Sequence, residues 1–437
     1  MSIAGPAVEG TVTFTPGPLR GEVRVPGDKS ISHRALIVGA AQSEPLRLEN
    51  VNTGADVLAT ADALRNLGAV IDLTGTSASV HSTKLHDAAE TVECRNSGST
   101  ARMVLGVCAG ANLCARFDGD QSLRSRPMEP VAAQLRAFGA LVETQNGCLP
   151  IEIAGTPQIQ TRDFILLSQS AQVKSALIFA ALFAKTAISI TNDAGSRDHT
   201  ERILEAFGAK IRYDRHGVVF EPSELTLTPL QIPGDFSAAA FFIVGAAICP
   251  GSAITIRDVG VNPTRTGLLD ALDAMGASIS VFNQREWNNE PVADIEVKAA
   301  PLSGTEIGAE VAARALDEIP VLAVAAAYAE GVTRISALRR LREKESDRLA
   351  ASVQTLQSVG VAAEQSPDEI VITGGDSVRP ADIQTIETHG DHRIAMAIAP
   401  LASLIGPLSI DDGDVLDVSF PNFPAAWKAA QSESSLA

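Results

Sequence analysis

Residues 33–70 read HRALIVGAAQSEPLRLENVNTGADVLATADALRNLGAV, and the rest of the chain repeats their plan. The stretch opens with an apolar, Ala-rich segment, His33–Ala41, and continues with the β-leaning run LRLENV. The next segment, Ala55–Leu67, has apolar residues spaced for one face of a helix. Gly68 then predicts a helix C-cap, where a left-handed backbone needs no Cβ atom.

The phrase apolar-Gly-Ala-apolar marks the end of each copy. It occurs as LGAV, FGAL, FGAK and MGAS and, more loosely, as VGVA; its glycines are Gly68, Gly139, Gly208, Gly276 and Gly360, at intervals of 71, 69, 68 and 84 residues. An Ala-rich segment and a short β-leaning run precede each phrase; the later Ala-rich segments are Thr100–Ala111, Ala171–Ala184, Ser237–Ile248 and Ile319–Ala329. A sixth copy begins at Asp391–Leu404 and continues through PLSIDD. We predict six units, each helix–strand–helix–strand, because ordinary helix punctuation by Gly-Ala would not keep this spacing.

Length and composition limit the class of protein. The chain has 437 residues, with 35 basic and 52 acidic side chains and a formal net charge of −17. At ~100–200 residues per domain, this length suggests two or three domains. A content of 45% apolar and 20% charged residues is typical of a folded globular protein. The negative charge argues against a protein that coats nucleic acid or an anionic membrane, although it does not exclude a small basic pocket.

Membrane, secretory and disulfide-rich classes are also disfavoured. The first residues, MSIAGPAVEG, lack a secretory signal pattern. Apolar stretches such as Ala238–Cys249 are shorter than the ~18–20 residues of a membrane-spanning helix. The five cysteines form no CxxC pair, so we expect neither a disulfide framework nor a zinc knuckle. These patterns favour a cytoplasmic protein that binds no nucleic acid and no membrane.

The segments ahead of the apolar helices are unusually polar. They read GDKSISHR, RNSGSTAR, SQSAQVK, LDEIP and HGDHR. Each could be an ordinary N-cap. However, Lys or Arg in a first helical turn opposes the helix dipole unless an anion lies there, and free backbone N–H groups suit phosphate or carboxylate. We therefore interpret these helix starts as candidate anion sites.

The segment LREKESDR carries a further cluster of charges. Lys344 and Arg348 have the same sign at the i, i+4 spacing of a helix start, and such pairs repel by ~0.2–0.5 kcal/mol. A shared anionic ligand explains them better than a solvated helix. A metal site at His389, Asp391 and His392 is disfavoured because the spacing supplies no fourth ligand. The acidic run Asp411–Asp414 lacks the terminal Glu of a calcium loop and is interpreted as a turn.

Eight ordered motifs together resemble the 5-enolpyruvylshikimate-3-phosphate (EPSP) synthase family, from about Pro18 to Trp427: VPGDKSISHRAL, NSGSTAR, SRP, SQSAQVKSAL, SRDHTER, LDEIPVLAVAAA, REKESDR and GDHRIAMA. The SAQVK and SRDHTER forms are similar to the class II bacterial members. The resemblance implies an α/β fold, a two-lobed inside-out barrel with three repeated units per lobe. Residues 26–234 would form the lobe on the shikimate 3-phosphate side. Residues 1–25 with 235–437 would form the lobe for phosphoenolpyruvate and proton transfer.

The resemblance also implies a reaction. Family members transfer the enolpyruvyl (carboxyvinyl) group of phosphoenolpyruvate to the 5-hydroxyl of shikimate 3-phosphate and release phosphate, in the pathway to chorismate and the aromatic amino acids. The implied mechanism is addition–elimination through a tetrahedral intermediate, without a metal or organic cofactor, in a site completed by lobe closure. It requires proton delivery to the methylene carbon, proton removal from the attacking hydroxyl, and cations for two phosphates and a carboxylate. We expect a monomer whose partners are these two small substrates.

Functional residues are carried over from the family only where this sequence matches its motifs. The residues implied in catalysis are Lys29, Asp317 and Glu345. Those implied in binding shikimate 3-phosphate are Lys29, Ser30, Arg34, Ser170, Gln172, Ser196, Arg197, Asp317 and Lys344. Those implied in binding phosphoenolpyruvate are Lys29, Asn96, Gly98, Arg126, Gln172, Arg348 and Arg393.

Three positions separate this chain from some relatives. Ala171 stands where many members have a second serine, and Val418 where class I members have a phosphoenolpyruvate-binding lysine, so neither contact is expected. Gly98 is retained where glyphosate-tolerant relatives have alanine, which predicts inhibition by that analogue. The nearest rival is the UDP-N-acetylglucosamine enolpyruvyl transferase family, whose loop cysteine is absent from GDQSLRSRP here. An anion-binding protein on a decayed enzyme fold is disfavoured because a pure binder has no use for Asp317 and Glu345 beside its anions.

Overall fold

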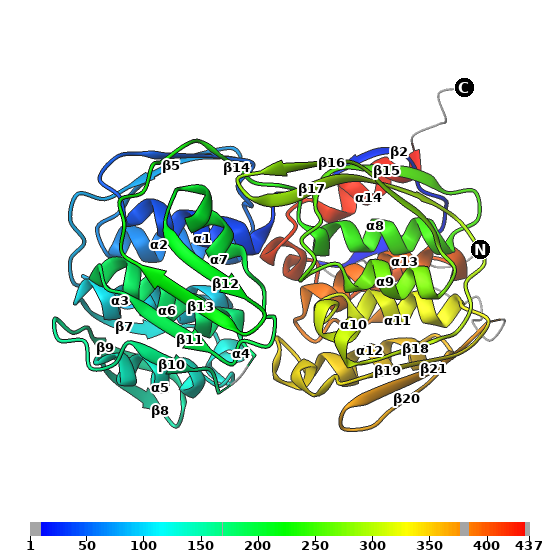
Figure 1. Ribbon diagram of the computed structural model, residues 1–437. Helices are drawn as coiled ribbons and strands as arrows, with labels where there is room; N and C mark the ends of the chain where they lie inside the picture. The colour runs from blue at the N-terminus through cyan, green and yellow to red at the C-terminus, as the bar shows by residue number, and fades with distance from the viewer. Residues whose placement is uncertain (1–9, 168, 376–383, 433–437) are drawn as a thin grey trace. The chain divides into compact units, whose positions relative to one another are not determined.

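The structure, a computed structural model, describes residues 10–167, 169–375 and 384–432. It divides into two compact lobes, coloured mainly blue to green and green to red in Figure 1. The N-terminal lobe comprises Pro26–Pro233 and Arg285–Val292, and the C-terminal lobe comprises Met1–Val25, Gly234–Gln284 and Ala293–Ala437. The segment Arg285–Val292 is the tip of a hairpin whose strands otherwise belong to the C-terminal lobe. The chain therefore passes between the lobes at this tip as well as after Val25 and Pro233.

Three repeats build the N-terminal lobe. The first contains α1(Lys29–Ala40), β3(Leu46–Glu49), α2(Ala55–Asn66), β4(Val70–Thr74) and β5(Ser77–His81), and β14(Leu230–Gln231) joins its sheet. The second contains β6(Val92–Glu93), α3(Gly98–Ala111), β7(Cys114–Asp118), α4(Gln121–Arg124), α5(Glu129–Phe138), β8(Leu141–Gln145) and β9(Cys148–Ala154). The third contains β10(Asp163–Ile165), α6(Ala171–Ala184), β11(Ile188–Thr191), α7(His199–Ala206), β12(Lys210–Asp214) and β13(Gly217–Glu221).

Three further repeats build the C-terminal lobe. The fourth contains β2(Arg20–Arg24), α8(Phe236–Ile248), β15(Ala253–Gly260), α9(Gly267–Ala274), β16(Ser278–Trp287) and β17(Glu290–Lys298). The fifth contains β18(Glu306–Ile307), α10(Ala309–Arg314), α11(Ile319–Tyr328), β19(Gly331–Ser336), the 3₁₀ helix η1(Arg339–Glu343), α12(Arg348–Ser358), β20(Ala362–Gln365) and β21(Glu369–Gly374). The sixth contains β22(Gln384–Ile386), α13(His392–Ile405), β23(Leu408–Ile410), the 3₁₀ helix η2(Asp414–Val418) and α14(Phe423–Ser432), and β1(Val12–Phe14) joins its sheet.

The first five repeats each form a four-stranded sheet of the same design, whereas the described strands of the sixth form a three-stranded sheet, β1-β23-β22. In the third repeat the order is β10-β11-β13-β12, with β10 parallel to β11 and both later pairs antiparallel. The predicted unit of helix–strand–helix–strand was therefore wrong in one respect, because its last strand is a hairpin. Two-residue turns cause this: Asn146 and Gly147 both have positive φ between β8 and β9, as the tightest hairpin turn requires.

The predicted glycine caps are confirmed. Gly68, Gly139, Gly208, Gly276 and Gly360 all have φ between 80 and 126°. This left-handed backbone is accessible to glycine without the steric cost that a Cβ imposes. At these five positions it turns the chain from the preceding helix into the following strand.

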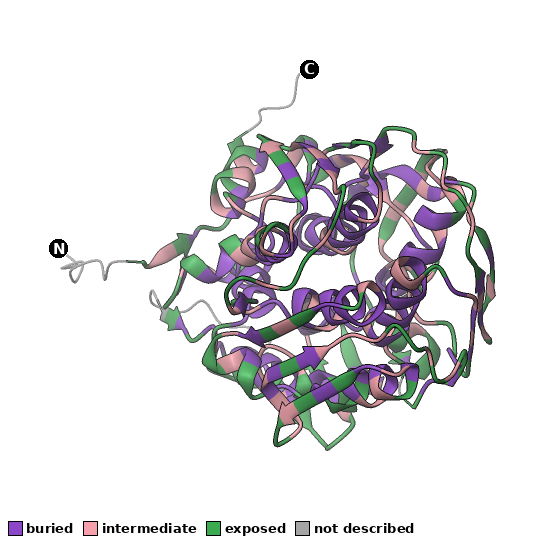
Figure 2. Ribbon diagram, turned by 90° about the vertical axis from the view of Figure 1, so that its left-hand side faces the viewer, coloured by how far each residue is buried: buried purple, intermediate pink, exposed green. Residues whose placement is uncertain are grey.

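The apolar helices are the core of each lobe. All residues of α8 are buried, and Figure 2 shows the helices largely purple while the strands alternate in colour. Helices α3 and α6 pack closely in the N-terminal lobe, because a Cβ at Gly106 or Gly110 would lie 2.2 or 2.1 Å from a carbonyl oxygen of α6. Because the sides of these helices are buried, their polar starts are the parts that carry candidate functional side chains.

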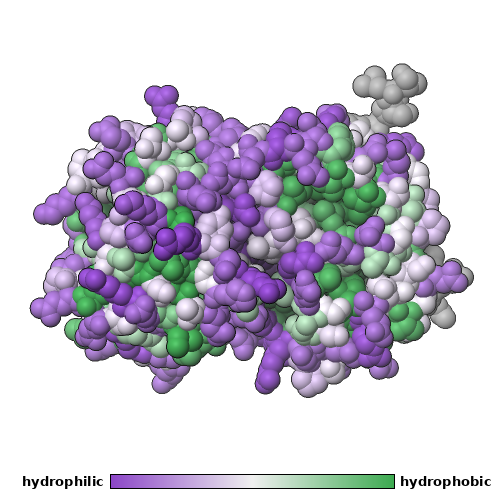
Figure 3. All heavy atoms as spheres, viewed as in Figure 1, coloured by the Kyte–Doolittle hydropathy of each residue, from purple (hydrophilic) through white to green (hydrophobic). Residues whose placement is uncertain are grey.

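The surface is mainly polar. Figure 3 shows hydrophilic residues over most of the face in view, with apolar residues between them. Exposed large apolar side chains include Leu141, Ile165 and Leu167. Within the described residues, no helix is both long and apolar enough to span a bilayer.

Candidate functional site

The start of α1 places Lys29 against an acidic partner. Asp28 caps the helix, accepting a hydrogen bond from the Ile31 backbone N–H at 2.9 Å. Lys29 is the first helical residue, and its Nζ donates to Asp56 Oδ2 at 2.8 Å. Ser30 follows and is half-buried. Asp56, in the first turn of α2, thus offsets the positive charge that Lys29 brings to a helix N-terminus.

Arg34, one turn further along α1, is buried among neutral oxygens. Its Nε donates to the Thr200 hydroxyl at 2.8 Å, Nη2 to the Ser175 hydroxyl at 3.0 Å, and Nη1 to the Ser30 carbonyl at 2.8 Å. Burial lowers the pKa of Arg34 to about 10; Glu201 opposes this shift and Arg197 adds to it. A buried cation with uncharged hydrogen-bond partners would be stabilised by an incoming anion.

The start of α3 holds a second cationic group. Arg126 is buried, and its Nη1 donates to the Asn96 carbonyl at 3.2 Å while Nη2 donates to Asn96 Oδ1. Gly98 is the first residue of α3. A Cβ there would lie 2.7 Å from Arg102 Nη1 and 3.6 Å from Arg126 Nη1. Glycine therefore leaves space beside two guanidinium groups.

The start of α6 is linked to α3 through Arg102. Arg102 Nη1 donates to Gln172 Oε1 at 2.8 Å, and Gln172 Nε2 donates to the Ser99 hydroxyl at 2.9 Å. Ser170 caps α6 by accepting from the Val173 backbone N–H. The two predicted ligands Ser170 and Gln172 thus lie at one helix start, and Gln172 is oriented by the neighbouring helix.

Ser196 and Arg197 lie in the loop between β11 and α7. The Ser196 hydroxyl donates to Asp193 Oδ1, and both Ser196 and Arg197 are half-buried. The pKa of Arg34 is depressed partly by Arg197, so these two cations influence each other. The predicted residues of the N-terminal lobe therefore all occur at or near the starts of α1, α3, α6 and α7.

In the C-terminal lobe, Asp317 joins two cations. Lys344 Nζ and Arg348 Nη1 both donate to Asp317 Oδ1, each at 3.2 Å. The two cations do share an anion, but it is a carboxylate of the protein. The i, i+4 helical alternative was wrong, because Asp347 caps α12 and the helix begins at Arg348, so Lys344 precedes it.

Arg348 is the centre of a buried acidic cluster. Its Nε and Nη2 donate to the two oxygens of Asp391 at 2.9 and 3.1 Å, and Nη2 also donates to Glu345 Oε2 at 2.5 Å. Burial alone would lower the pKa of Arg348, but the carboxylates of Asp391, Glu345 and Asp317 outweigh burial and raise it. Arg348 is therefore a permanent cation.

Arg393 is held more loosely than Arg348. It is the second residue of α13, where Asp391 caps the helix by accepting from the Arg393 backbone N–H at 2.9 Å. Its Nη2 lies 4.0 Å from Asp317 Oδ2 and its Nη1 lies 3.9 Å from Glu318 Oε1. These are ion-pair separations rather than hydrogen bonds.

Sequence reasoning missed four buried acidic residues that contact or influence these site residues. Asp56, Asp391, Asp193 and Glu201 were not among the predicted site residues, and Asp391 was considered only as a metal ligand. Each is at least 90% buried. A signal was present for Asp391 alone, as an acidic cap directly before an apolar helix. His389 Nδ1 lies 3.4 Å from Glu387 Oε1. Among the described residues, no group of three or more His, Cys, Asp or Glu side chains is placed to hold a metal ion.

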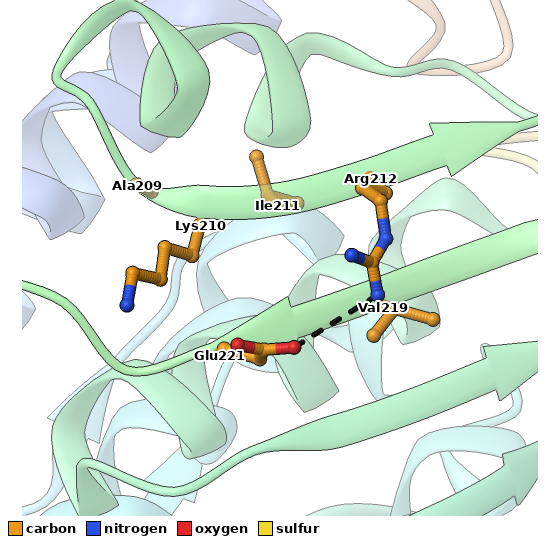
Figure 4. Close-up of a pocket in the computed structure, with 6 residues that line it drawn as sticks. All are labelled: Ala209, Lys210, Ile211, Arg212, Val219 and Glu221. Carbon is orange, nitrogen blue, oxygen red and sulfur yellow. Dashed lines mark ion pairs between the residues drawn. The ribbon is translucent and has the colours of Figure 1, made fainter.

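A surface pocket lies away from all of these residues. Figure 4 shows it on β12 and β13, lined by Ala209, Lys210, Ile211, Arg212, Val219 and Glu221. The Arg212 and Glu221 side chains form an exposed ion pair at 3.8 Å. None of the six lining residues belongs to the polar helix starts, so the pocket adds nothing to the candidate site.

Comparisons with known proteins agree on one family. Residues 14–427 match the family model described as EPSP synthase (3-phosphoshikimate 1-carboxyvinyltransferase). A 3-phosphoshikimate 1-carboxyvinyltransferase of Gloeobacter violaceus is 45% identical over 93% of this chain and 95% of its own length. The structure of an EPSP synthase from Acinetobacter baumannii is 36% identical, with a TM-score of 0.84 over 97% of this chain and 98% of that chain. The enolpyruvyl transferase NikO from Streptomyces tendae, 18% identical with a TM-score of 0.74 over 96% of this chain and 97% of its own, shares the fold.

Proposed function

The chain belongs to the EPSP synthase family, and on that premise we propose that it transfers the enolpyruvyl group of phosphoenolpyruvate to the 5-hydroxyl of shikimate 3-phosphate. The bond between C2 of phosphoenolpyruvate and its phosphate ester oxygen breaks. A bond between C2 and the 5-hydroxyl oxygen of the acceptor forms, and phosphate leaves. The observation that carries this proposal is Asp317, a buried carboxylate between two cations, Lys344 and Arg348. It combines a proton acceptor with charges that suit anionic substrates.

We assign the first proton transfer to Asp317. Its carboxylate accepts the 5-hydroxyl proton as the hydroxyl oxygen attacks the C2 carbon of phosphoenolpyruvate. Proton delivery to the methylene carbon belongs to Glu345 or Lys29. Addition of the hydroxyl oxygen to C2 and of a proton to the methylene carbon gives the tetrahedral intermediate. When this intermediate collapses, the methyl carbon loses a proton and phosphate leaves.

Basic side chains offset the negative charges of the two substrates. The residues that bind shikimate 3-phosphate are Lys29, Ser30, Arg34, Ser170, Gln172, Ser196, Arg197, Asp317 and Lys344. Those that bind phosphoenolpyruvate are Lys29, Asn96, Gly98, Arg126, Gln172, Arg348 and Arg393. The internal carboxylates prearrange these cations before substrate arrives. Arg393, held only at ion-pair distances from Asp317 and Glu318, can turn its hydrogen bonds to a substrate carboxylate at little cost.

Release of inorganic phosphate tests the proposal. The purified chain is incubated with phosphoenolpyruvate and either shikimate 3-phosphate or UDP-N-acetylglucosamine. We expect phosphate release, and formation of the enolpyruvyl ether, with shikimate 3-phosphate alone. Release with the sugar nucleotide instead would assign the chain the activity of the rival family, and release with neither would reject the transferase proposal.

We also propose that the enzyme works as a cytoplasmic monomer. Buried Cys94, Cys108 and Cys249 are free thiols, which suits a reducing compartment. Light scattering coupled to size-exclusion chromatography should give the mass of one chain, and a mass of two chains would contradict the monomer.

A further inference from the structure

Lys174 is a fully buried cation with no role in the proposed chemistry. It lies in the first turn of α6, two residues after the predicted ligand Gln172. Its Nζ lies 2.8 Å from Asp193 Oδ2 and 2.7 Å from Glu201 Oε1, and all three side chains are at most 2% exposed. An isolated buried charge is costly, so Lys174 and its two carboxylates stabilise one another as a unit. We call these three residues the Lys174 cluster.

The Lys174 cluster contacts both the side chain and the backbone of Ser196. Asp193 uses its second oxygen, Oδ1, to accept from the Ser196 hydroxyl. Lys174 Nζ lies 3.4 Å from the Ser196 carbonyl oxygen, to which it donates. The backbone and the side chain of a proposed phosphate ligand are therefore both fixed by a cluster that itself faces away from solvent.

The loop that carries Ser196 needs such support. Asn192, Ala194 and Gly195 have φ of 65, 50 and 74°. Two of these residues carry a Cβ, and a left-handed backbone is unfavourable for them by ~1 kcal/mol or more. Lys174, which lies outside the loop, supplies contacts that hold this conformation, to Asp193 Oδ2 at 2.8 Å and to the Ser196 carbonyl oxygen at 3.4 Å.

The cluster also acts on the neighbouring cations through its charge. Glu201 raises the pKa of Arg34, and Arg197 lowers it. With all groups ionised, one lysine and two carboxylates leave the cluster one negative charge. Loss of the lysine charge alone would leave the cluster two negative charges, one of them on Glu201, which acts on Arg34. The attraction of Arg34 for a phosphate dianion would then weaken.

We infer that Lys174 is a positioning residue for the phosphate group of shikimate 3-phosphate, acting through Ser196 and through the charge that Arg34 experiences. The inference rests on the proposed function. It predicts a defect specific to one substrate, because phosphoenolpyruvate has no proposed ligand in the loop between β11 and α7. A residue that only stabilised the fold would not distinguish the two substrates.

The test compares Lys174→Met with Lys174→Met/Glu201→Gln and, as a matched control, with Lys185→Met at the exposed end of the same helix. We expect Lys174→Met to raise the KM for shikimate 3-phosphate ~10-fold or more, the scale of a lost charge-assisted hydrogen bond, with the KM for phosphoenolpyruvate nearly unchanged. The double variant should recover part of this loss, because it removes the surplus negative charge. Lys185→Met should match the parent enzyme.

Two results would overturn the inference: an equal rise in both KM values, or no recovery in the double variant. If Lys174→Met does not fold, Asp193→Asn addresses the same link, since it weakens the acceptor of the Ser196 hydroxyl while keeping the side-chain shape. It should change the KM for shikimate 3-phosphate and leave the KM for phosphoenolpyruvate nearly unchanged, and an equal effect on both counts against the inference. Activity of the unmodified chain with shikimate 3-phosphate is measured in parallel, so absence of that activity identifies a failure of the proposed function instead.

Discussion

Arg348 donates to both oxygens of the Asp391 carboxylate, from Nε to Oδ2 at 2.9 Å and from Nη2 to Oδ1 at 3.1 Å. The exposed fraction of both side chains is at most 1%. The pair joins the start of α12 to the start of α13, because Asp391 is also the cap of α13. One carboxylate therefore orients a proposed phosphoenolpyruvate ligand and caps the helix that carries another, Arg393.

Asp391→Asn should disturb both stability and substrate binding. Breaking a buried charge pair costs ~3–5 kcal/mol, so we expect the free energy of unfolding to fall by about that amount. Asparagine keeps the helix cap, and the KM for phosphoenolpyruvate should rise ~10-fold or more because Arg348 loses its orienting partner. Urea unfolding and steady-state kinetics measure the two effects.

Asp347→Asn is the matched control for this change. Asp347 caps α12, but it is exposed and pairs with Arg342 at the surface. Exposed pairs contribute ~0–1 kcal/mol. Equal losses of stability in the two variants would mean that the buried pair has no special weight.

Asp317→Asn and Glu345→Gln should each lower kcat ~10²-fold or more, the usual contribution of a general acid or base. Both substitutions keep the side-chain shape, so Lys344 and Arg348 retain a hydrogen-bond acceptor. Glu343→Gln, on an exposed residue of η1, is the control and should leave kcat unchanged. A rate near that of the parent enzyme would remove the substituted residue from the proton-transfer steps.

Gly98→Ala should weaken phosphoenolpyruvate binding. The added Cβ would lie 2.7 Å from Arg102 Nη1, so Arg102 must shift and its hydrogen bond to Gln172 is strained. We expect a KM for phosphoenolpyruvate raised ~10-fold, as for one disturbed charge-assisted hydrogen bond, and reduced inhibition by glyphosate. Gly308→Ala is the control, since nothing lies within 4 Å of a Cβ there.

The parent enzyme should itself be inhibited by glyphosate, because Gly98 is retained. Inhibition is measured at several phosphoenolpyruvate concentrations. A weak response at inhibitor levels well above that of phosphoenolpyruvate would contradict this expectation.

His33 should make stability fall in mild acid. Its Nδ1 lies 2.7 Å from the Thr60 hydroxyl, and burial, with help from Lys29 and Arg34, holds the pKa of His33 well below its usual value. As the pH falls through ~6.5, His33 binds a proton in the unfolded chain but not in the folded chain. His33 therefore contributes stability above that pH, and this contribution is lost as the pH falls.

His33→Asn keeps a polar atom near the Nδ1 position and removes the titration. Below pH 6 its free energy of unfolding should depend less steeply on pH than that of the parent, by up to ~1.4 kcal/mol per pH unit. Urea unfolding at pH 7.5, 6.5 and 5.5 measures the slope. Identical slopes for His33→Asn and the parent would exclude the proposed titration.

Much of the fold followed from local patterns. The glycines at 68, 139, 208, 276 and 360 have the positive φ predicted from their place after a helix. The segment Ala171–Ala184 was predicted from its Ala-rich composition, and α6 has those bounds. These features depend on residues within one or two turns, where backbone sterics and apolar periodicity act directly. The hairpins were not predicted, although Asn146-Gly147 between β8 and β9 is a typical two-residue hairpin turn.

The sequence by itself determined the six repeats, the polar helix starts and, through its motifs, the EPSP synthase family. Only the tertiary structure decided which carboxylate serves which cation. Lys29 meets Asp56 across 27 residues and Arg348 meets Asp391 across 43. Such pairs form because two helix starts are neighbours in the packed core, and the energy that joins them depends on distance and burial in space. Spacing along the chain contains neither quantity, so the Lys174 cluster and its link to Ser196 became visible only once the helices were in place.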